Sequence, residues 1–431
     1  MTIPLPPRKS TPRPPGGRRL SAAVAVGLIA LTATGAGAGQ RTDTPAAVLP
    51  PGPRWPASTA CDASSGRVLS VGPGQPYAAP SAAAAAARDG DVVRIRAGDY
   101  RGDVATWRAS RLTICGHGGR ARLFADGRHA GGKAIWVIAG ADITIDGIEF
   151  HGARVPDHNG AGIRAEHRRG ELRVLNSGFY DNQTGLLSAA GPVAIHIEGS
   201  EFARSDTGTL AALGHNLYVG RIDRLTVRRS FLHEAVRGHN LKSRARVSVI
   251  ESSYLMDGPA GRSSYLADFP DGGAVTLRGN LLHKGPRAEN PTAVAFGAES
   301  LGAGSIHTLD MRHNTLVMTR RGGHFLRAPP GTQSVHLTAN IWAGTDPAGL
   351  ITGGFDIGRA VQRDNARFAA SDFPGADALG APRFWPRRAT PALPAQAGAS
   401  VEDLLHDSPQ PFVERLTSGR PRMAGALQSA P

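Results

Sequence analysis

The chain has 431 residues, of which 41% are hydrophobic, and it carries a formal net charge of +14. Its composition excludes a disordered protein, and its length allows one large domain or two to three ordinary ones. With 55 glycines and only 6% aromatic residues, it is better suited to many short strands joined by tight corners than to long packed helices.

Residues 1–39 have the layout of a secretory signal. A basic, proline-rich stretch is followed by an apolar run from Ala22 to Ala33 and then by small residues. An uncleaved N-terminal anchor is the alternative, although the run is short for the ~20 residues that span a bilayer. We therefore expect a secreted or periplasmic protein that begins near Gly39 and has no other membrane-spanning segment.

The charge balance points to an anionic partner. Cleavage of the leader would lower the net charge from +14 to +9, and an exported protein this basic favours a partner such as an acidic polysaccharide. Arginine outnumbers lysine by 45 to 4, however, which is typical of a coding bias. The basic residues form no run interleaved with aromatic residues, so we expect no nucleic-acid partner.

Two cysteines, Cys61 and Cys115, follow a proline-rich linker at residues 40–60. In an oxidising compartment they could form a disulfide. The sequence does not give their separation in space, so two unpaired buried thiols are the alternative.

The stretch PSAAAAAARDGD at residues 80–91 predicts a short helix that ends at Gly90, followed by the strand VVRIRAG. If further strands stack on this first strand, its other edge stays unpaired. An unpaired strand edge can pair with other chains, so it must be covered. We expect the helix to provide that cover.

From residue 143 onward one pattern recurs: an apolar residue, two variable residues, Ser or Asn, a variable residue, and an apolar or aromatic residue. The Ser or Asn positions are Ser177, Ser200, Ser230, Ser252, Asn280, Asn314 and Asn340, and a further copy has Ile148 in that place. Successive copies lie 22 to 34 residues apart. This period, filled with short strands, predicts a solenoid, because each coil can bury its apolar side chains only against its neighbours.

The expected fold is therefore all-β, a parallel β-helix with an N-terminal capping helix. We expect about nine or ten coils within residues 61–345, with the Ser and Asn side chains aligned along one edge. Residues 346–431 would form an irregular C-terminal cover, and we expect a monomer. Helical repeats are excluded, because no long run with a period of 3.6 is present.

This layout resembles the secreted right-handed parallel β-helix proteins of the pectate-lyase-like superfamily. The stretches that carry the resemblance are PSAAAAAARDGDVVRIRAGDYRG, ITIDGIEF, GIRAE, HNLYVG, GHNLKSRA, DFPDGG and MAGALQ. The resemblance covers roughly residues 70–431 and implies a right-handed β-helix. It implies less about activity, because the superfamily includes lyases, hydrolases, esterases and proteins with no known reaction.

The stretches GHNLYVG and GHNLKSRA begin 24 residues apart, which is one coil. Because alternate strand residues face opposite sides, Tyr218 and Lys242 should lie side by side on the outer surface. The same alternation puts Asp268 outward in the next coil, beside Lys242 or Arg244. The candidate site residues on this strip and at its ends are Arg164, His215, Asn216, Tyr218, His239, Asn240, Lys242, Arg244, Asp268 and Glu299.

These side chains suit β-elimination on a polymer of uronic acids, which removes a proton α to a carboxylate. Lys242 is the candidate base, because a lysine can give up its proton where an arginine cannot. Arg244 would neutralise the carboxylate, and Tyr218 would be the acid or would exchange roles with Lys242. His239 is a further candidate base. The resemblance adds that some β-helix polysaccharide lyases use a Lys/Arg pair in this manner.

The other candidates are assigned to substrate binding. They are Asn216, Asn240, His215, Asp268, Arg164 and Glu299. Outer positions of any soluble β-helix are polar, so the strip could instead be a solvated salt-bridge patch. The histidines could simply fill the corner before each strand, and the asparagines could be ladder residues.

Other functions stay open. A hydrolase of the polygalacturonase type needs two or three carboxylates at one bond, whereas the strip offers Asp268, with Asp271 in a turn. An esterase of the pectin type needs paired Asp and Arg and is also served less well. A non-catalytic glycan-binding protein would need no catalytic group. No cofactor or metal motif is evident, although Ca²⁺ bound by Asp268 with Glu289 or Glu299 stays open, because many members of the superfamily use calcium.

Overall fold

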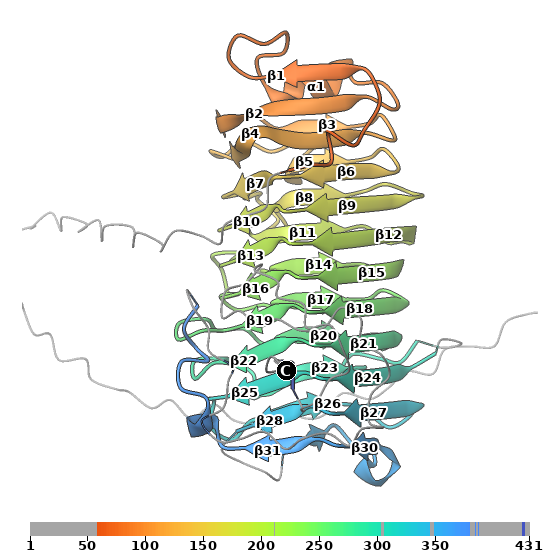
Figure 1. Ribbon diagram of the computed structural model, residues 1–431, viewed down its shortest axis with the longest axis vertical. Coiled ribbons are helices and arrows are strands. Elements are labelled where there is room, and N and C mark those ends of the chain that lie inside the picture. Colours follow the sequence, from red (N-terminus) through yellow and green to blue (C-terminus); the bar gives the residue numbers. More distant parts are fainter. Residues whose placement is uncertain are drawn as a thin grey trace, which may run out of the picture. The chain divides into compact units, whose positions relative to one another are not determined.

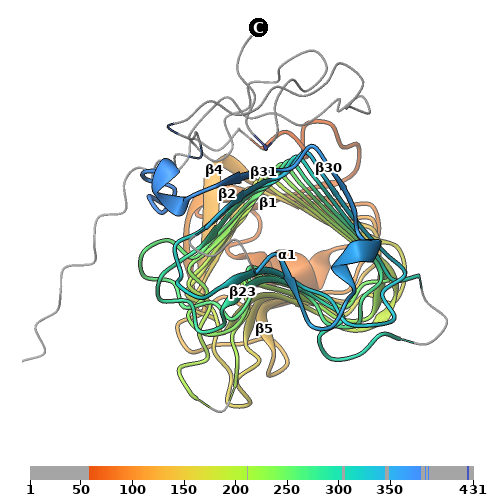
Figure 2. The same ribbon diagram turned by 90° about the horizontal axis from the view of Figure 1, so that it is seen from below.

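The computed structural model describes residues 58–210, 212–302, 306–344 and 349–379, together with residues 384, 387, 425 and 426. The described strands form a parallel β-helix of about 11 turns (Figure 1). Seen along its axis, the coils enclose a three-sided core (Figure 2). The predicted right-handed β-helix fold is confirmed. The leader, most of the linker and most of the expected C-terminal cover lie outside the described residues.

One side of the β-helix is a ten-stranded parallel sheet. From the N-terminal end its strands are β3 (Ala105–Trp107), β5 (Ala134–Ile138), β8 (Ala161–Ala165), β11 (Thr184–Ser188), β14 (Leu217–Val219), β17 (Leu241–Ser243), β20 (Ala267–Phe269), β23 (Thr292–Phe296), β26 (His324–Arg327) and β29 (Ile351–Thr352).

The other two sides are two rows of a 21-stranded sheet, which begins with β1 (Val68–Val71), β2 (Val92–Arg101) and β4 (Thr113–Phe124). The β6–β30 row contains β6 (Ile143–Asp146), β9 (Glu171–Leu175), β12 (Gly191–Glu198), β15 (Ile222–Arg228), β18 (Val247–Glu251), β21 (Ala274–Arg278), β24 (Thr308–Arg312), β27 (Ser334–Thr338) and β30 (Val361–Arg363). The β7–β31 row contains β7 (Ile148–His151), β10 (Gly178–Tyr180), β13 (Glu201–Ala203), β16 (Phe231–His233), β19 (Tyr254–Met256), β22 (Leu281–Lys284), β25 (Thr315–Met318), β28 (Ile341–Ala343) and β31 (Ala366–Phe368). The strands thus continue past residue 345, so the β-helix is longer than expected.

A ladder of buried side chains lines the corner between these two rows, as predicted. The Ser230 Oγ accepts a hydrogen bond from the Ser200 backbone N–H at 3.1 Å, and the Asn314 Oδ1 accepts one from the Asn280 N–H at 3.0 Å. The ladder ends in Asn365, which the sequence analysis missed and which accepts from the Asn340 N–H at 2.9 Å. Each rung joins one coil to the next.

One rung was assigned wrongly. Ser253, not Ser252, occupies the ladder, because the Ser253 Oγ accepts the Ser230 N–H at 3.1 Å. Ser252 instead has a φ of 48°. A left-handed residue precedes the ladder position in the neighbouring coils as well, for example Arg229 and Gly279. The corner therefore needs a residue with positive φ directly before the ladder residue. Where two serines follow each other, the sequence does not show which one has the positive φ and which one belongs to the ladder.

The N-terminal end is closed by a helix. Helix α1 (Pro80–Ala86) ends before the predicted Gly90, and its Ala83 is buried in the core. Cys61 and Cys115 are joined by a disulfide, which ties the start of the described chain to β4. Within the described part of the chain, no helix has the length and hydropathy needed to cross a lipid bilayer.

At the C-terminal end, the short helices η1 (Ile357–Arg359) and η2 (Ala370–Asp372) flank β30 and β31. Four residues after β31 pack on the apolar outer face of the β7–β31 row. They are Phe373, Ala376, Phe384 and Ala426. Gly425 donates its N–H to the Ala339 carbonyl at 2.7 Å. These described parts of residues 346–431 thus cover one face of the stack.

The ladder generates a stability prediction. Asn314→Ala removes the acceptor of the Asn280 N–H and the donor to the Leu277 carbonyl at 2.9 Å, both in a buried corner. We expect the free energy of unfolding to fall by roughly 3 kcal/mol, measured by urea unfolding, because buried partners lose their bonds. The exposed Asn159→Ala is the control and should cost less than about 0.5 kcal/mol. Equal effects of both changes would contradict the structural role of the ladder.

Candidate functional site

The predicted outer row exists on the ten-stranded sheet. Tyr218 pairs in register with Lys242, and Lys242 with Asp268. Toward the N-terminal end, Leu187 and Arg164 continue the row. The 24-residue spacing and the strand alternation therefore placed the three central side chains correctly. We call Tyr218, Lys242, Asp268 and the neighbouring Arg244 and Glu299 the Lys242 cluster.

Lys242 lies at the centre of this cluster. Its Nζ is 2.8 Å from the Glu299 Oε1 and 3.5 Å from the Asp268 Oδ2. It also lies 5.5 Å from the centroid of the Tyr218 ring. The Lys242 side chain is only 11% exposed, whereas that of Glu299 is 49% exposed. The ammonium group is thus held between one buried and one accessible carboxylate.

Arg244 is the second cation of the cluster. Its Nε donates to the Tyr218 hydroxyl oxygen at 3.0 Å, and its two terminal nitrogens bind Asp271 and Glu299. Burial disfavours the charged guanidinium, but the hydrogen bonds to Glu299 and Tyr218 outweigh burial and raise the pKa of Arg244. Arg244 therefore stays charged. Because the Tyr218 oxygen accepts from Arg244, the hydroxyl proton is free to be donated elsewhere.

Asp268 is more buried than its outward position suggested. It is 2% exposed, and burial raises its pKa to about 6, against the opposing effect of Lys242. Among the described residues, its Oδ1 has no hydrogen-bond partner. Its Oδ2 lies 3.3 Å from the His239 Nε2. The expectation that the outward register would leave this carboxylate in solvent was therefore wrong, since Lys242 and His239 cover it.

His215 and His239 lie beside the cluster with their rings tilted by 35° and the ring centroids 4.8 Å apart. The His215 Nδ1 accepts the His239 backbone N–H at 3.0 Å, and the His239 Nδ1 accepts the Tyr265 N–H at 3.1 Å. A backbone amide can only donate, so the proton of each neutral ring sits on Nε2.

Burial, and then the nearby Lys242 and Arg244, lower the pKa of His215 to about 3. Burial and the neighbouring His215 also hold the pKa of His239 well below its ordinary value. Both rings are therefore neutral at neutral pH. His239 presents an N–H to Asp268 rather than a free lone pair, and it is 4% exposed. This geometry supports Asp268 and does not place His239 as an accessible base.

Asn216 and Asn240 do not face outward as predicted, and both are fully buried. The Asn216 Nδ2 donates to the Asn240 Oδ1 at 2.8 Å and to the His233 carbonyl at 2.7 Å. They form a second ladder. Both residues lie in the corner before the strand, where the alternation of inward and outward side chains has not yet begun. A Cβ on Gly238 would lie 1.8 Å from the Gly214 carbonyl oxygen, and one on Gly214 would lie 2.5 Å from the Gln183 carbonyl oxygen, so both stretches must open with glycine.

One further predicted residue, Arg164, lies apart from the cluster. Arg164 is separated from Tyr218 by Leu187 and pairs with Glu166 at 3.4 Å, and Glu166 also binds Lys133 at 2.5 Å. A cavity of about 640 Å³ opens beside Glu166 and Lys133. Arg164 thus belongs to a separate charged region two coils from Tyr218.

We add Asp271 and Arg221 to the Lys242 cluster, because they extend its ion pairs; the sequence analysis missed their contacts. Asp271 was assigned to a turn without a further role, yet its Oδ1 binds Arg244 and its Oδ2 lies 2.7 Å from the Arg221 Nε. Arg221 is 50 positions before Asp271, and both lie in connections between strands. The repeat aligns strand residues only, so no signal in the sequence brought these two together.

The carboxylates named as possible calcium ligands bind side-chain cations of the protein. Asp268 and Glu299 share the Lys242 ammonium, and Glu289 pairs elsewhere, with Arg237 at 3.2 Å and Arg262 at 2.9 Å. Across the described ranges, no group of three or more His, Cys, Asp or Glu is placed to hold a metal ion. We derive no step through a metal.

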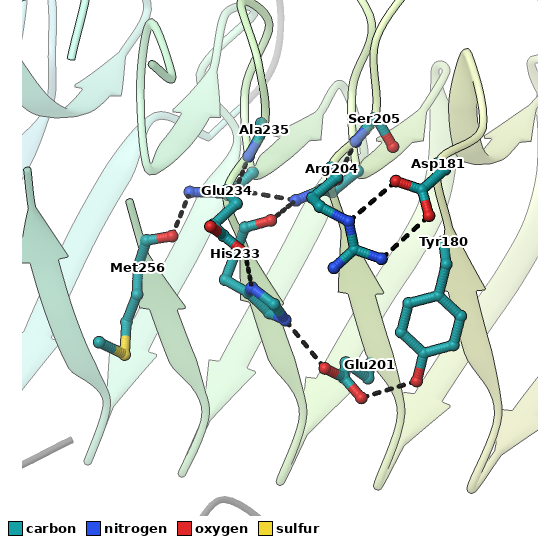
Figure 3. A network of polar contacts seen from close by, with 11 residues as sticks. Tyr180, Asp181, Glu201, Arg204, Ser205, His233, Glu234, Ala235 and Met256 are labelled. Atoms are coloured by element: carbon teal, nitrogen blue, oxygen red, sulfur yellow. Dashed lines mark hydrogen bonds and ion pairs between the residues drawn. The ribbon is translucent and has the colours of Figure 1, made fainter. Parts of the chain in front are cut away.

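A second polar cluster, also missed, lies on the β7–β31 row (Figure 3). The Tyr180 hydroxyl donates to the Glu201 Oε2 at 2.7 Å, and the His233 Nε2 lies 2.9 Å from the Glu201 Oε1. Arg204 pairs with Asp181 at 2.8 Å. Burial alone would lower the pKa of His233, but the hydrogen bonds to Glu201 and Glu234 have the larger effect, and the pKa is raised. These groups bind one another across three coils, which is the arrangement of a structural network.

The geometry can be compared with known proteins. No protein-family model matches the chain, and no curated protein sequence matches it. Among solved structures, pectate lyase Pel9A is similar with a TM-score of 0.54 at 15% identity, over 86% of this chain and 100% of that one. An alginate lyase from Paenibacillus sp. str. FPU-7 has a TM-score of 0.48 at 16% identity, over 70% of this chain and 99% of its own. The TM-score of the alginate lyase is below 0.5, so this likeness is not used further. At these identities the likeness concerns the fold alone, and the chain has the pectate-lyase-like β-helix fold.

Proposed function

We propose that this protein is a polysaccharide lyase that cleaves an acidic, uronate-containing polysaccharide by β-elimination at the Lys242 cluster. The observation that carries the proposal is the pair Lys242 and Arg244, two cations that share one accessible carboxylate, Glu299. A pair that holds a carboxylate from the protein is also suited to hold one from a sugar. The β-helix fold, shared with pectate lyase Pel9A, is consistent with this activity by analogy only.

The proposed mechanism assigns one step to each side chain. Arg244 binds the uronate carboxylate and stabilises the negative charge that develops when the α proton leaves. Lys242 accepts that proton. Tyr218, whose oxygen accepts from Arg244 at 3.0 Å, donates its own proton to the leaving glycosidic oxygen. Asp268 positions Lys242 through their ion pair, and the N–H of His239 faces the carboxylate of Asp268.

A glycoside hydrolase is the second candidate. The structure brings more carboxylates together than the sequence analysis expected, and this observation favours a hydrolase. Asp268 and Glu299 approach the same ammonium, and Asp271 and Glu299 bind the same guanidinium. Converging carboxylates are what hydrolysis requires. The products separate the two reactions, because elimination leaves an unsaturated sugar that absorbs in the ultraviolet and hydrolysis does not. Binding without any turnover would instead indicate a glycan-binding protein.

The first prediction concerns Lys242→Arg. The change keeps the positive charge but removes a group that can give up its proton. We expect turnover of the responsive substrate to fall roughly 100-fold or more, while glycan binding and the thermal midpoint stay near the parent values. The assay follows ultraviolet absorbance across alginate, pectate, glycosaminoglycans and bacterial exopolysaccharides. Turnover at the parent rate would show that Lys242 is only a surface charge.

The second prediction concerns the pH dependence of that turnover. The pKa of Asp268 is raised to about 6, so its carboxylate is ionised above that pH and protonated below it. Protonation removes the charge that positions Lys242. We expect kcat/KM to fall as the pH drops through about 6, and Asp268→Asn should be slow at every pH and lack this limb. An unchanged acid limb in Asp268→Asn would assign the titration to another group.

We also propose that the protein is exported. The leader supports this, and so does the Cys61–Cys115 disulfide, because such bonds persist in oxidising compartments. N-terminal sequencing of periplasmic and medium fractions should find a mature chain that begins near Gly39 or Gln40. A membrane-bound product that retains Met1 would show that the apolar run is an anchor.

A further inference from the structure

Glu299 differs from the other carboxylates of the Lys242 cluster in its exposure. Its side chain is 49% exposed, against 3% for Asp268 and 14% for Asp271. It nevertheless binds both central cations, with one oxygen 2.8 Å from the Lys242 Nζ and the other on Arg244. An accessible carboxylate therefore occupies the place between the two cations that faces solvent.

The backbone that carries Glu299 is fixed. The Glu299 and Ser300 amides both donate to the Pro270 carbonyl at 3.1 Å, and the Gly297 amide donates to the Phe269 carbonyl at 2.8 Å. Leu301 packs against the core. Release of the two cations therefore requires only rotation of the Glu299 side chain about its own bonds, with no movement of the chain.

The charges of the cluster balance with Glu299 in place. The cations are Lys242, Arg244 and Arg221, and the anions are Asp268, Asp271 and Glu299. When the Glu299 side chain rotates out, the three cations and the two remaining anions carry a net charge of +1. That surplus equals the charge of one incoming uronate carboxylate.

We propose that Glu299 is an internal stand-in for the substrate carboxylate, which displaces it on binding. This inference rests on the proposed function and adds the position of the substrate. The uronate carboxylate takes the place of the Glu299 carboxylate against Arg244. The sugar carbon that bears the acidic hydrogen is bonded directly to that carboxylate, so it is carried next to Lys242. Glu299 also rejects neutral sugars, which cannot compete for the two cations.

The proposal predicts that removal of an acidic residue from the site strengthens binding of an acidic ligand. Glu299→Gln should bind a galacturonate or mannuronate tetramer about tenfold more tightly than the parent protein in titration calorimetry, because no internal carboxylate competes. Cellotetraose, a neutral tetramer, should bind no better than before.

Glu289→Gln is the matched control. Glu289 also bridges two cations, Arg237 and Arg262, and its loss changes the net charge by the same amount, so it should leave binding unchanged. Equal gains in the two variants would show a general charge effect and overturn the inference.

The outcomes separate this inference from the proposed function. Unchanged or weaker tetramer binding by Glu299→Gln, together with loss of binding in Lys242→Met, would refute the stand-in role and leave the lyase proposal intact. Loss of turnover in Glu299→Gln with saturated binding would make Glu299 a catalytic carboxylate instead. No tetramer binding by the parent and all variants would overturn both proposals.

Discussion

The hydrogen bonds between neighbouring coils are the constraint on which the rest of this structure depends. The strands of each coil are short, and they satisfy their backbone groups on the coils before and after them. Register between coils is therefore the property that matters most, because a slip of one residue would turn every outer side chain inward. The two ladders, one of Ser and Asn at the corner of the 21-stranded sheet and one of Asn216 and Asn240, hold the register. Tyr218, Lys242 and Asp268 are neighbours only for as long as it holds.

The buried carboxylate of Asp268 lowers the stability of the folded chain. A carboxylate whose pKa is raised from 3.8 to about 6 by burial is harder to ionise in the folded chain than in the unfolded one. The penalty is absent below about pH 4, grows as the pH rises, and reaches roughly 3 kcal/mol above pH 6. Lys242 and His239 reduce this penalty without removing it. Buried carboxylates with perturbed pKa values gather at functional sites, so Asp268 supports the role proposed for the Lys242 cluster.

The sequence was sufficient for the fold because a solenoid repeats one local rule in every coil. It was also sufficient for the row of Tyr218, Lys242 and Asp268, since strand alternation and a one-coil spacing decide which side chains meet. It failed where that rule stops. The prediction for Asn216 applied the alternation of strand residues to a corner residue, where it does not hold. The prediction for Ser252 failed because two consecutive serines do not show which of them has a positive φ.

The sequence also failed at connections between strands. Asp271 and Arg221 meet over 50 positions, and their meeting depends on loop paths that the repeat does not encode. Glu299 was named, but as a substrate ligand at a strand end, without its contacts to both cations. Such contacts depend on side-chain directions outside the strands, where a pattern of residue types carries no geometric information.

The place of the Lys242 cluster along the stack has a consequence for its durability. In the ten-stranded sheet, strands β11, β8, β5 and β3 lie between β14 and one end, and β23, β26 and β29 lie between β20 and the other. Because coils contact only their neighbours, thermal opening of a solenoid begins at its ends and moves inward. Opening from one end must therefore pass three or four strands of the ten-stranded sheet before it reaches β14, β17 and β20, and the backbone amides of these strands should exchange with solvent later than those of the end coils.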